Sequence, residues 1–137
     1  MEKVNIEGRE YDVKYTTGFP IPSGMSGIVL FKKIYIDPRW ASVPGSLEHE
    51  AVHVRQQETD GWWKFAFRYV FSRDWRLEYE ARAYAHQIVI TCRTLKLNYS
   101  TELARVTSFL YGNYRLQSKF SVDLVKARID FFVGLID

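Results

Sequence analysis

The sequence has little cysteine and no long apolar run. The first shortage excludes an internal disulfide, and the second argues against a membrane-spanning protein. Cys92 is the single cysteine among 137 residues, so no disulfide can form within the chain. Nothing therefore requires an oxidising compartment. Lys64 and Arg68 interrupt the most aromatic stretch, and no other stretch has the length and apolarity of a bilayer span. We expect no membrane partner.

A signal peptide and a basic block are missing as well. The first residues lack the apolar run of a secretory leader, so we expect a cytoplasmic protein, or a virion-associated one if it is phage-encoded. The 19 basic and 16 acidic residues are interspersed and give a net charge of +3. Because a nucleic-acid footprint needs basic residues gathered on one face, we expect no nucleic-acid partner.

Apolar residues are frequent, at 47% of the chain, and the length suits one domain with one modest core over residues 1–137. Residues 1–40 are the strand-rich part. Apolar and polar residues alternate at 4–6 and 11–15, on either side of a turn at Glu7-Gly8. Residues 28–30 and 34–36 predict a second strand pair or one long strand.

Residues 41–137 are the helical part. Ser42 and Pro44 are typical of a helix start, and the helix they open is expected to run to about Thr59 and to end at Gly61. Further helices are expected over 62–72, from Asp74 to about Leu97, near 101–112 and near 121–135. The predicted fold class is α+β, with a small N-terminal antiparallel sheet followed by a helical bundle.

The most informative motif is His49-Glu50-Ala51-Val52-His53, which matches the pattern HExxH. On a helix, residues four apart lie on the same face, so both imidazoles can bind one zinc ion. Glu50 then lies beside them as a general base for a metal-bound water. We therefore predict His49 and His53 as zinc ligands and Glu50 as the catalytic residue.

A catalytic zinc needs a third protein ligand, and Glu78 and Glu80 are the candidates. The metzincin continuation HExxHxxGxxH is excluded, because Gln56 and Thr59 stand where it has Gly and His. The matching residues in 46–86 are instead HExxHxxQ, ending at Gln56, and a later ExEAxAxA stretch beginning at Glu78. In these residues the chain resembles the gluzincin class of zincin-like zinc metallopeptidases, and most nearly their small phage and bacterial relatives.

The resemblance implies Glu78 as the third ligand, because the family pattern ExxxD places the ligand four residues before an Asp. Arg82 occupies that Asp position, which is a departure from the family. The family's Asp orients a ligating histidine, and Arg cannot accept the imidazole hydrogen bond. Small residues beside Glu78 also allow a close approach of the HExxH helix. We favour Glu78 and keep Glu80 as the alternative.

Other parts of a peptidase site are expected from several segments. Donors for a developing oxyanion could come from Tyr84, Tyr111, Tyr114 or Arg115, although each tyrosine is also typical of core packing. Residues 27–31 could form an edge strand that binds an extended peptide, or an ordinary core strand. For the aromatic residues between 62 and 71 we expect mainly a core role, with a lid or an interface as alternatives.

The sequence therefore favours a zinc-dependent metallopeptidase that acts on a peptide or protein substrate. The alternative is a virion or effector protein that keeps a metallopeptidase-like scaffold for a structural or interaction role within a larger assembly, because a fold does not fix a function. A nucleic-acid binder, suggested by the pI of 9.0 alone, ranks third.

Overall fold

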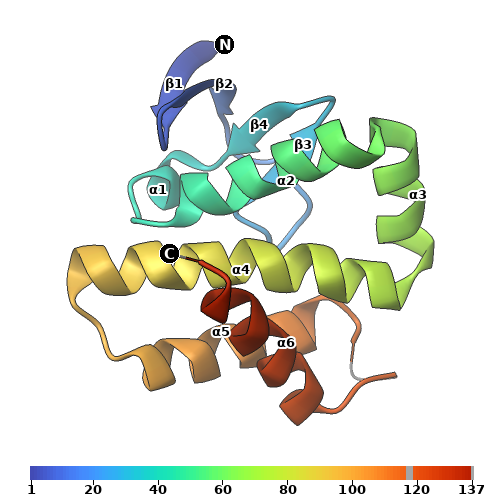
Figure 1. The fold of residues 1–137 in the computed structure, drawn as a ribbon. Coiled ribbons are helices and arrows are strands. Elements are labelled where there is room, and N and C mark those ends of the chain that lie inside the picture. Colours follow the sequence, from blue (N-terminus) through green and yellow to red (C-terminus); the bar gives the residue numbers. More distant parts are fainter. Residues whose placement is uncertain (117–118, 137) are drawn as a thin grey trace.

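The computed structural model describes residues 1–116 and 119–136, which form a small sheet followed by helices (Figure 1). The strands are β1 (Glu2–Ile6), β2 (Arg9–Tyr15), β3 (Gly27–Leu30) and β4 (Lys33–Ile36). The helices are α1 (Pro38–Ala41), α2 (Ser46–Asp60), α3 (Trp62–Phe71), α4 (Arg73–Leu95), α5 (Tyr99–Asn113) and α6 (Val122–Gly134). The α+β class predicted from the sequence is confirmed.

The sheet is mixed rather than antiparallel, which corrects the prediction. Its strand order is β1-β2-β4-β3, with β1 antiparallel to β2 and β3 antiparallel to β4, whereas β2 and β4 pair in parallel. The reason is the long connection after Tyr15. It carries the chain to the far edge of the sheet, where β3 forms, and the tight turn at Phe31-Lys32 brings β4 back in the direction of β2.

The helix starts differ from those predicted at two places. A short helix, α1, follows Asp37, whose side chain accepts from the backbone N–H of Arg39, so α2 begins only after Gly45. Helix α4 is capped by the Ser72 side chain, which accepts from the N–H of Trp75. Asp74 lies inside the first turn of α4 and pairs with Lys119 instead.

The molecule has two apolar cores, and α2 and α4 lie between them (Figure 1). One core packs the sheet against one face of α2, with Val13, Ile34 and Val54 among its buried members. The other is formed by α4, α5 and α6, around Ile88, Leu110 and Ile129. Helices α2 and α4 run side by side in Figure 1, so their facing surfaces meet between the two cores.

The aromatic segment forms α3, as predicted, but its side chains are mostly not core residues. Only Phe65 of this helix is buried, whereas Trp63, Phe67 and Phe71 are exposed. The expectation of a mainly core role is therefore wrong for this segment. Among the described residues, no helix combines the length and the apolarity that a membrane span requires.

Candidate metal centre

His49 and His53 occupy successive turns of α2 on the face directed toward α4. Both side chains are buried, and their rings meet edge to face with centroids 4.9 Å apart. The opposite face of α2 packs Ala51 and Val54 into the sheet core. This division of faces fixes the rotation of the helix, so both imidazoles face α4, as the HExxH spacing predicts.

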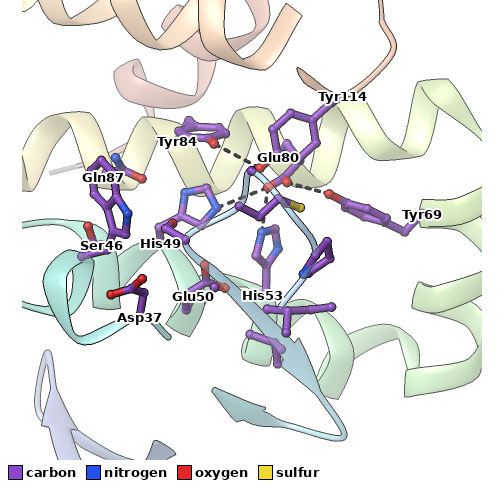
Figure 2. Close-up of a pocket in the computed structure, with 18 of the residues that line it drawn as sticks. Asp37, Ser46, His49, Glu50, His53, Tyr69, Glu80, Tyr84, Gln87 and Tyr114 are labelled. Carbon is purple, nitrogen blue, oxygen red and sulfur yellow. Dashed lines mark hydrogen bonds and ion pairs between the residues drawn. The ribbon is translucent and has the colours of Figure 1, made fainter. Parts of the chain in front are cut away.

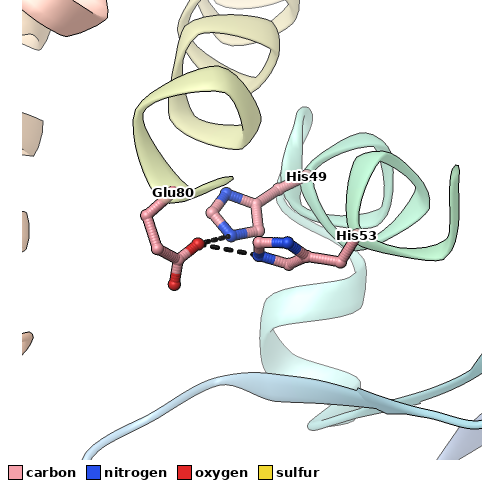
Figure 3. Close-up of side chains that lie close together, drawn as sticks. All are labelled: His49, His53 and Glu80. Atoms are coloured by element: carbon pink, nitrogen blue, oxygen red, sulfur yellow. Dashed lines mark ion pairs between the residues drawn. The ribbon is translucent and has the colours of Figure 1, made fainter. Parts of the chain in front are cut away.

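The third side chain in this group is Glu80, from the first half of α4 (Figure 3). Its Oε1 lies 2.7 Å from Nε2 of His53 and 3.3 Å from Nε2 of His49. One ligand atom from each of the three residues lies within 4.8 Å of the others, and all three residues are buried. Two nitrogens and one carboxylate oxygen thus converge as a group that could hold a metal ion.

The structure corrects the preference for Glu78. The Glu78 carboxylate points away from the histidines and forms an ion pair with Arg128 of α6, at 2.5 Å. Glu78 and Glu80 lie on opposite sides of the apolar stripe of α4, and α6 covers the Glu78 side while α2 covers the Glu80 side. The alternative, Glu80, is the glutamate beside His49 and His53.

Gln56 supplies the acceptor that Arg82 cannot. Its Nε2 donates to the backbone carbonyl of Tyr79, at 3.1 Å, so its Oε1 faces Nδ1 of His53, at 2.8 Å. This network assigns a proton to Nδ1 of His53 and leaves Nε2 as the ring nitrogen directed at Glu80. Arg82 itself lies over the ring of Phe132, 4.7 Å from its centroid.

Neither Nδ1 of His49 nor the side chain of His86 is hydrogen-bonded to Glu80 or Gln56. The Nδ1 atom of His49 is buried and has no hydrogen-bond partner among the residues the structure describes, and its ring packs edge to face on Tyr84 at 4.4 Å. His86, the third histidine, is half-buried outside this group and pairs with Glu7 at 2.9 Å. Only His49 and His53 are therefore available to a common ion.

Burial and mutual charge shift the pKa values of this group. Burial would raise the pKa of Glu80, but the charges and hydrogen bonds of His53 and His49 outweigh it and hold that pKa well below its usual range. Burial would lower the pKa of His53, but Glu80 raises it to about 9. Burial raises the pKa of Glu50, which the nearby histidines oppose only in part.

Three tyrosines surround the group, and the sequence analysis anticipated two of them (Figure 2). The Tyr69 hydroxyl donates to Oε2 of Glu80 at 2.7 Å, and the hydroxyls of Tyr84 and Tyr114 lie 3.1 Å apart. Burial raises the pKa of all three phenols well above the usual value, so they remain neutral donors. Tyr69 was missed because no motif or spacing links α3 to the face of α4 that carries Glu80.

The two remaining oxyanion candidates lie elsewhere. The Tyr111 side chain packs against the helical core. Arg115 is exposed, follows α5 with a left-handed backbone, and is not among the residues that line the cavity at this centre. Tyr84 and Tyr114 are thus the predicted donors that the fold brings to the centre.

A cavity of about 670 Å³ opens at this centre, between α2, β3, α3 and α4 (Figure 2). Glu50 lines it beside the histidines, on the side of the edge strand β3. At Gly27 a Cβ atom would lie 3.0 Å from Oε1 of Glu50 and 2.9 Å from the carbonyl oxygen of Tyr35. Only a glycine therefore lets the strand come this close to Glu50 without displacement.

The predicted edge strand is confirmed as β3, which stands at the end of the strand order, although Phe31 belongs to the following turn. Part of its edge is already bonded, because Nε2 of Gln57 donates to the carbonyl of Val29 at 2.9 Å. Gln57 also accepts from the N–H of Lys32, at 3.0 Å. These bonds fix the distance between β3 and α2, and with it the width of the cavity.

Comparison of the chain with protein-family models, with curated proteins and with solved structures finds no match.

Proposed function

We propose that the protein is a zinc-dependent metallopeptidase in which His49, His53 and Glu80 hold the ion and Glu50 is the general base. The observation that carries this proposal is the convergence of two Nε2 atoms and one carboxylate oxygen within 4.8 Å, buried, with Glu50 lining the same cavity. Two histidines and one glutamate are a ligand set typical of catalytic zinc. The resemblance of residues 46–86 to gluzincins adds the expectation of a peptide substrate.

The residues present fit a cation for a reason of hydrogen-bond chemistry. With its Nδ1 proton donated to Gln56 Oε1, His53 directs Nε2 at Glu80 Oε1, at 2.7 Å, and the raised pKa of His53 reflects how strongly this buried carboxylate favours a positive charge beside it. Glu80 Oε1 is buried and has no hydrogen-bond partner with good geometry among the described residues. A divalent ion held by Glu80 and the two imidazole nitrogens would supply that positive charge in place of a proton.

Held by His49, His53 and Glu80, a zinc ion would supply Lewis acidity to the scissile carbonyl and to water. The chain's own residues supply the rest. Glu50 takes the proton of the attacking water on one of its carboxylate oxygens and passes it to the leaving amine nitrogen. Tyr84 and Tyr114 line the same cavity as neutral hydroxyl donors, suited to a developing oxyanion. The β3 edge near Gly27 offers main-chain groups to an extended peptide.

The test separates metal binding from proton transfer. Glu50→Gln should retain about one zinc per chain but lose cleavage of a peptide library by at least about a hundredfold, since the amide cannot accept the proton. Glu48→Gln is the matched control, because Glu48 lies on the same helix and does not line the cavity. It should retain both zinc and cleavage.

Two results would contradict the proposal. One is zinc-loaded protein that cleaves no member of the library. The other is a Glu50→Gln protein as active as the unchanged chain, since the proton would then pass through a different group.

A further inference from the structure

The outward side of α3 carries a continuous exposed apolar surface. Trp63, Phe67 and Phe71 are 77%, 66% and 75% exposed, and Val70 is 59% exposed. Phe31, in the turn between β3 and β4, is 60% exposed. These five residues are called the aromatic end face, because α3 and this turn lie at the same end of the molecule (Figure 1).

Helical spacing explains why the α3 side chains form one surface. Residues 63, 67, 70 and 71 fall within about 100° of the helix circumference at 3.6 residues per turn. Phe65 and Tyr69 lie on the opposite side and pack inward, with ring centroids 5.7 Å apart. Helix α3 is therefore apolar on both sides. A monomer seldom exposes so large an apolar patch unless it binds another surface.

The turn between β3 and β4 extends the patch beyond the helix. The Phe31 ring stacks on Trp62, with centroids 4.2 Å apart, and Trp62 contacts Trp63 edge to face at 4.7 Å. These ring contacts hold Phe31 beside the helix rather than leaving it as an isolated side chain. The exposed residues Lys32, in the same turn, and Lys33, the first residue of β4, follow directly.

The charges around the aromatic end face are predominantly positive. Between Gly61 and Arg73 the chain carries cations but no carboxylate. Among the described residues, no ion pair engages Lys64 or Arg73, both exposed. The carboxylates nearest in sequence already have partners. Glu58 forms an ion pair with Arg9, and Asp74 forms one with Lys119. Asp60 pairs with Arg68 and accepts a hydrogen bond from Tyr79. The unpaired charge at this face is therefore cationic.

We propose that the aromatic end face docks on the surface of an anionic lipid bilayer. Tryptophan and phenylalanine side chains on one side of a helix, flanked by lysine and arginine, suit the headgroup region, where rings insert and cations meet lipid phosphates. A second copy of the chain fits less well, because a symmetric contact would bring the cations of both copies together.

This docking would place the cavity next to the lipid surface. The inner side of α3, with Phe65 and Tyr69, forms one wall of the cavity, while the outer side faces the bilayer. This proposal departs from the expectation of no membrane partner, which was drawn from the lack of a spanning stretch in the sequence. Val70 lies at the border between the aromatic end face and the cavity, but the residues altered in the experiment below do not line the cavity, so the docking can be tested apart from the proposed peptidase activity.

The experiment is co-sedimentation of the full chain with vesicles of two compositions. One vesicle is pure phosphatidylcholine and the other contains about a third phosphatidylserine. The unchanged protein should sediment with the anionic vesicles only, and more weakly as salt is added. The double variant Trp63→Ser, Phe67→Ser should lose at least about tenfold in partitioning, and Lys64→Glu about thirtyfold.

Matched controls distinguish binding through the aromatic end face from non-specific binding to the vesicles. Phe131→Ser and Lys126→Glu change an exposed phenylalanine and an exposed lysine of α6, away from the aromatic end face, and should bind as the unchanged protein does. Circular dichroism melting checks that each variant folds.

Three outcomes would overturn the proposal. The first is no binding to anionic vesicles, and the second is equal binding to both compositions. The third is sedimentation velocity showing a dimer that dissociates in the double variant, which would make the face a contact between copies.

Discussion

Gln56 determines which nitrogen of His53 faces Glu80. Its amide is fixed at both ends, by the Tyr79 carbonyl and by the His53 ring, and it lies on the same helix one turn after the histidine. Such partners orient a ligating imidazole and increase its basicity, and their loss typically weakens metal binding without unfolding the protein.

Gln56→Leu is therefore expected to weaken zinc binding by about ten- to a hundredfold, because the Nδ1 proton loses its acceptor. Gln56→Glu should weaken binding less than Gln56→Leu does, since a carboxylate still accepts the Nδ1 hydrogen bond although it loses the donation to the Tyr79 carbonyl. Competition titration against a chromophoric chelator measures both affinities. Equal loss in the two variants would contradict the orienting role.

Among single residues, the sequence was sufficient to predict that His49 and His53 lie together with Glu50 nearby, but not to predict which glutamate lies beside them. The HExxH pattern is local, and a helix alone brings its histidines together. Glu78 and Glu80 are equivalent on the helix, and the choice between them depends on which neighbour covers each side. Glu78 forms an ion pair with Arg128 of α6, which lies fifty residues later in the chain. No local sequence pattern reveals that contact.

Between elements, the start of α2 lies close to α4 at Gly45, the residue that precedes the helix. A Cβ there would lie 2.6 Å from Thr91 Oγ1 and 2.7 Å from the carbonyl oxygen of Gln87, and the backbone of Gly45 is left-handed, with φ of 96°. Thr91 also donates to the carbonyl of Pro44 at 2.7 Å. Glycine at this position allows the two helices to bring His49 and Glu80 together.

Gly45→Ala should lower the free energy of unfolding by about 2 kcal/mol or more, from backbone strain together with the clash. Gly112→Ala in α5 is the control, because no atom lies within 4 Å of the Cβ it would add. That control should be neutral or slightly stabilising, since alanine favours a helix. Urea denaturation measures both, and equal midpoints would contradict the close approach.

The helices and turns were predictable from the sequence where they depend only on neighbouring residues. The turn at Glu7-Gly8 and the helices after Gly61 follow from alternation, apolar spacing and helix-ending glycine. The parallel pairing of β2 with β4 was not predictable, because it depends on where a long connection returns to the sheet. The start of α2 was misplaced because Ser42 and Pro44 belong to the tight connection between α1 and α2.

Over the whole molecule, the candidate metal centre joins two cores. His49 and His53 come from the helix that packs on the sheet, and Glu80 comes from the helix that packs on α5 and α6. An ion held by all three would connect these halves, so its binding energy would stabilise the entire fold.

Zinc at about a thousandfold excess over its dissociation constant should stabilise the protein by about 4 kcal/mol, which corresponds to a rise in Tm of roughly 10 to 20 °C. A chelator should reverse the rise. His49→Ala is the control and should show little response to zinc. Differential scanning calorimetry measures the shift, and a Tm indifferent to zinc and chelator would contradict an ion that bridges the cores.

The most direct test of the central claim is elemental analysis of protein purified without chelator or metal-affinity resin, for the unchanged chain, Glu80→Gln and Glu78→Gln. We predict about one zinc per chain in the unchanged protein and in Glu78→Gln, and less than about a tenth of that in Glu80→Gln. Zinc retained by Glu80→Gln but lost from Glu78→Gln, or no metal in any of the three, would contradict the account.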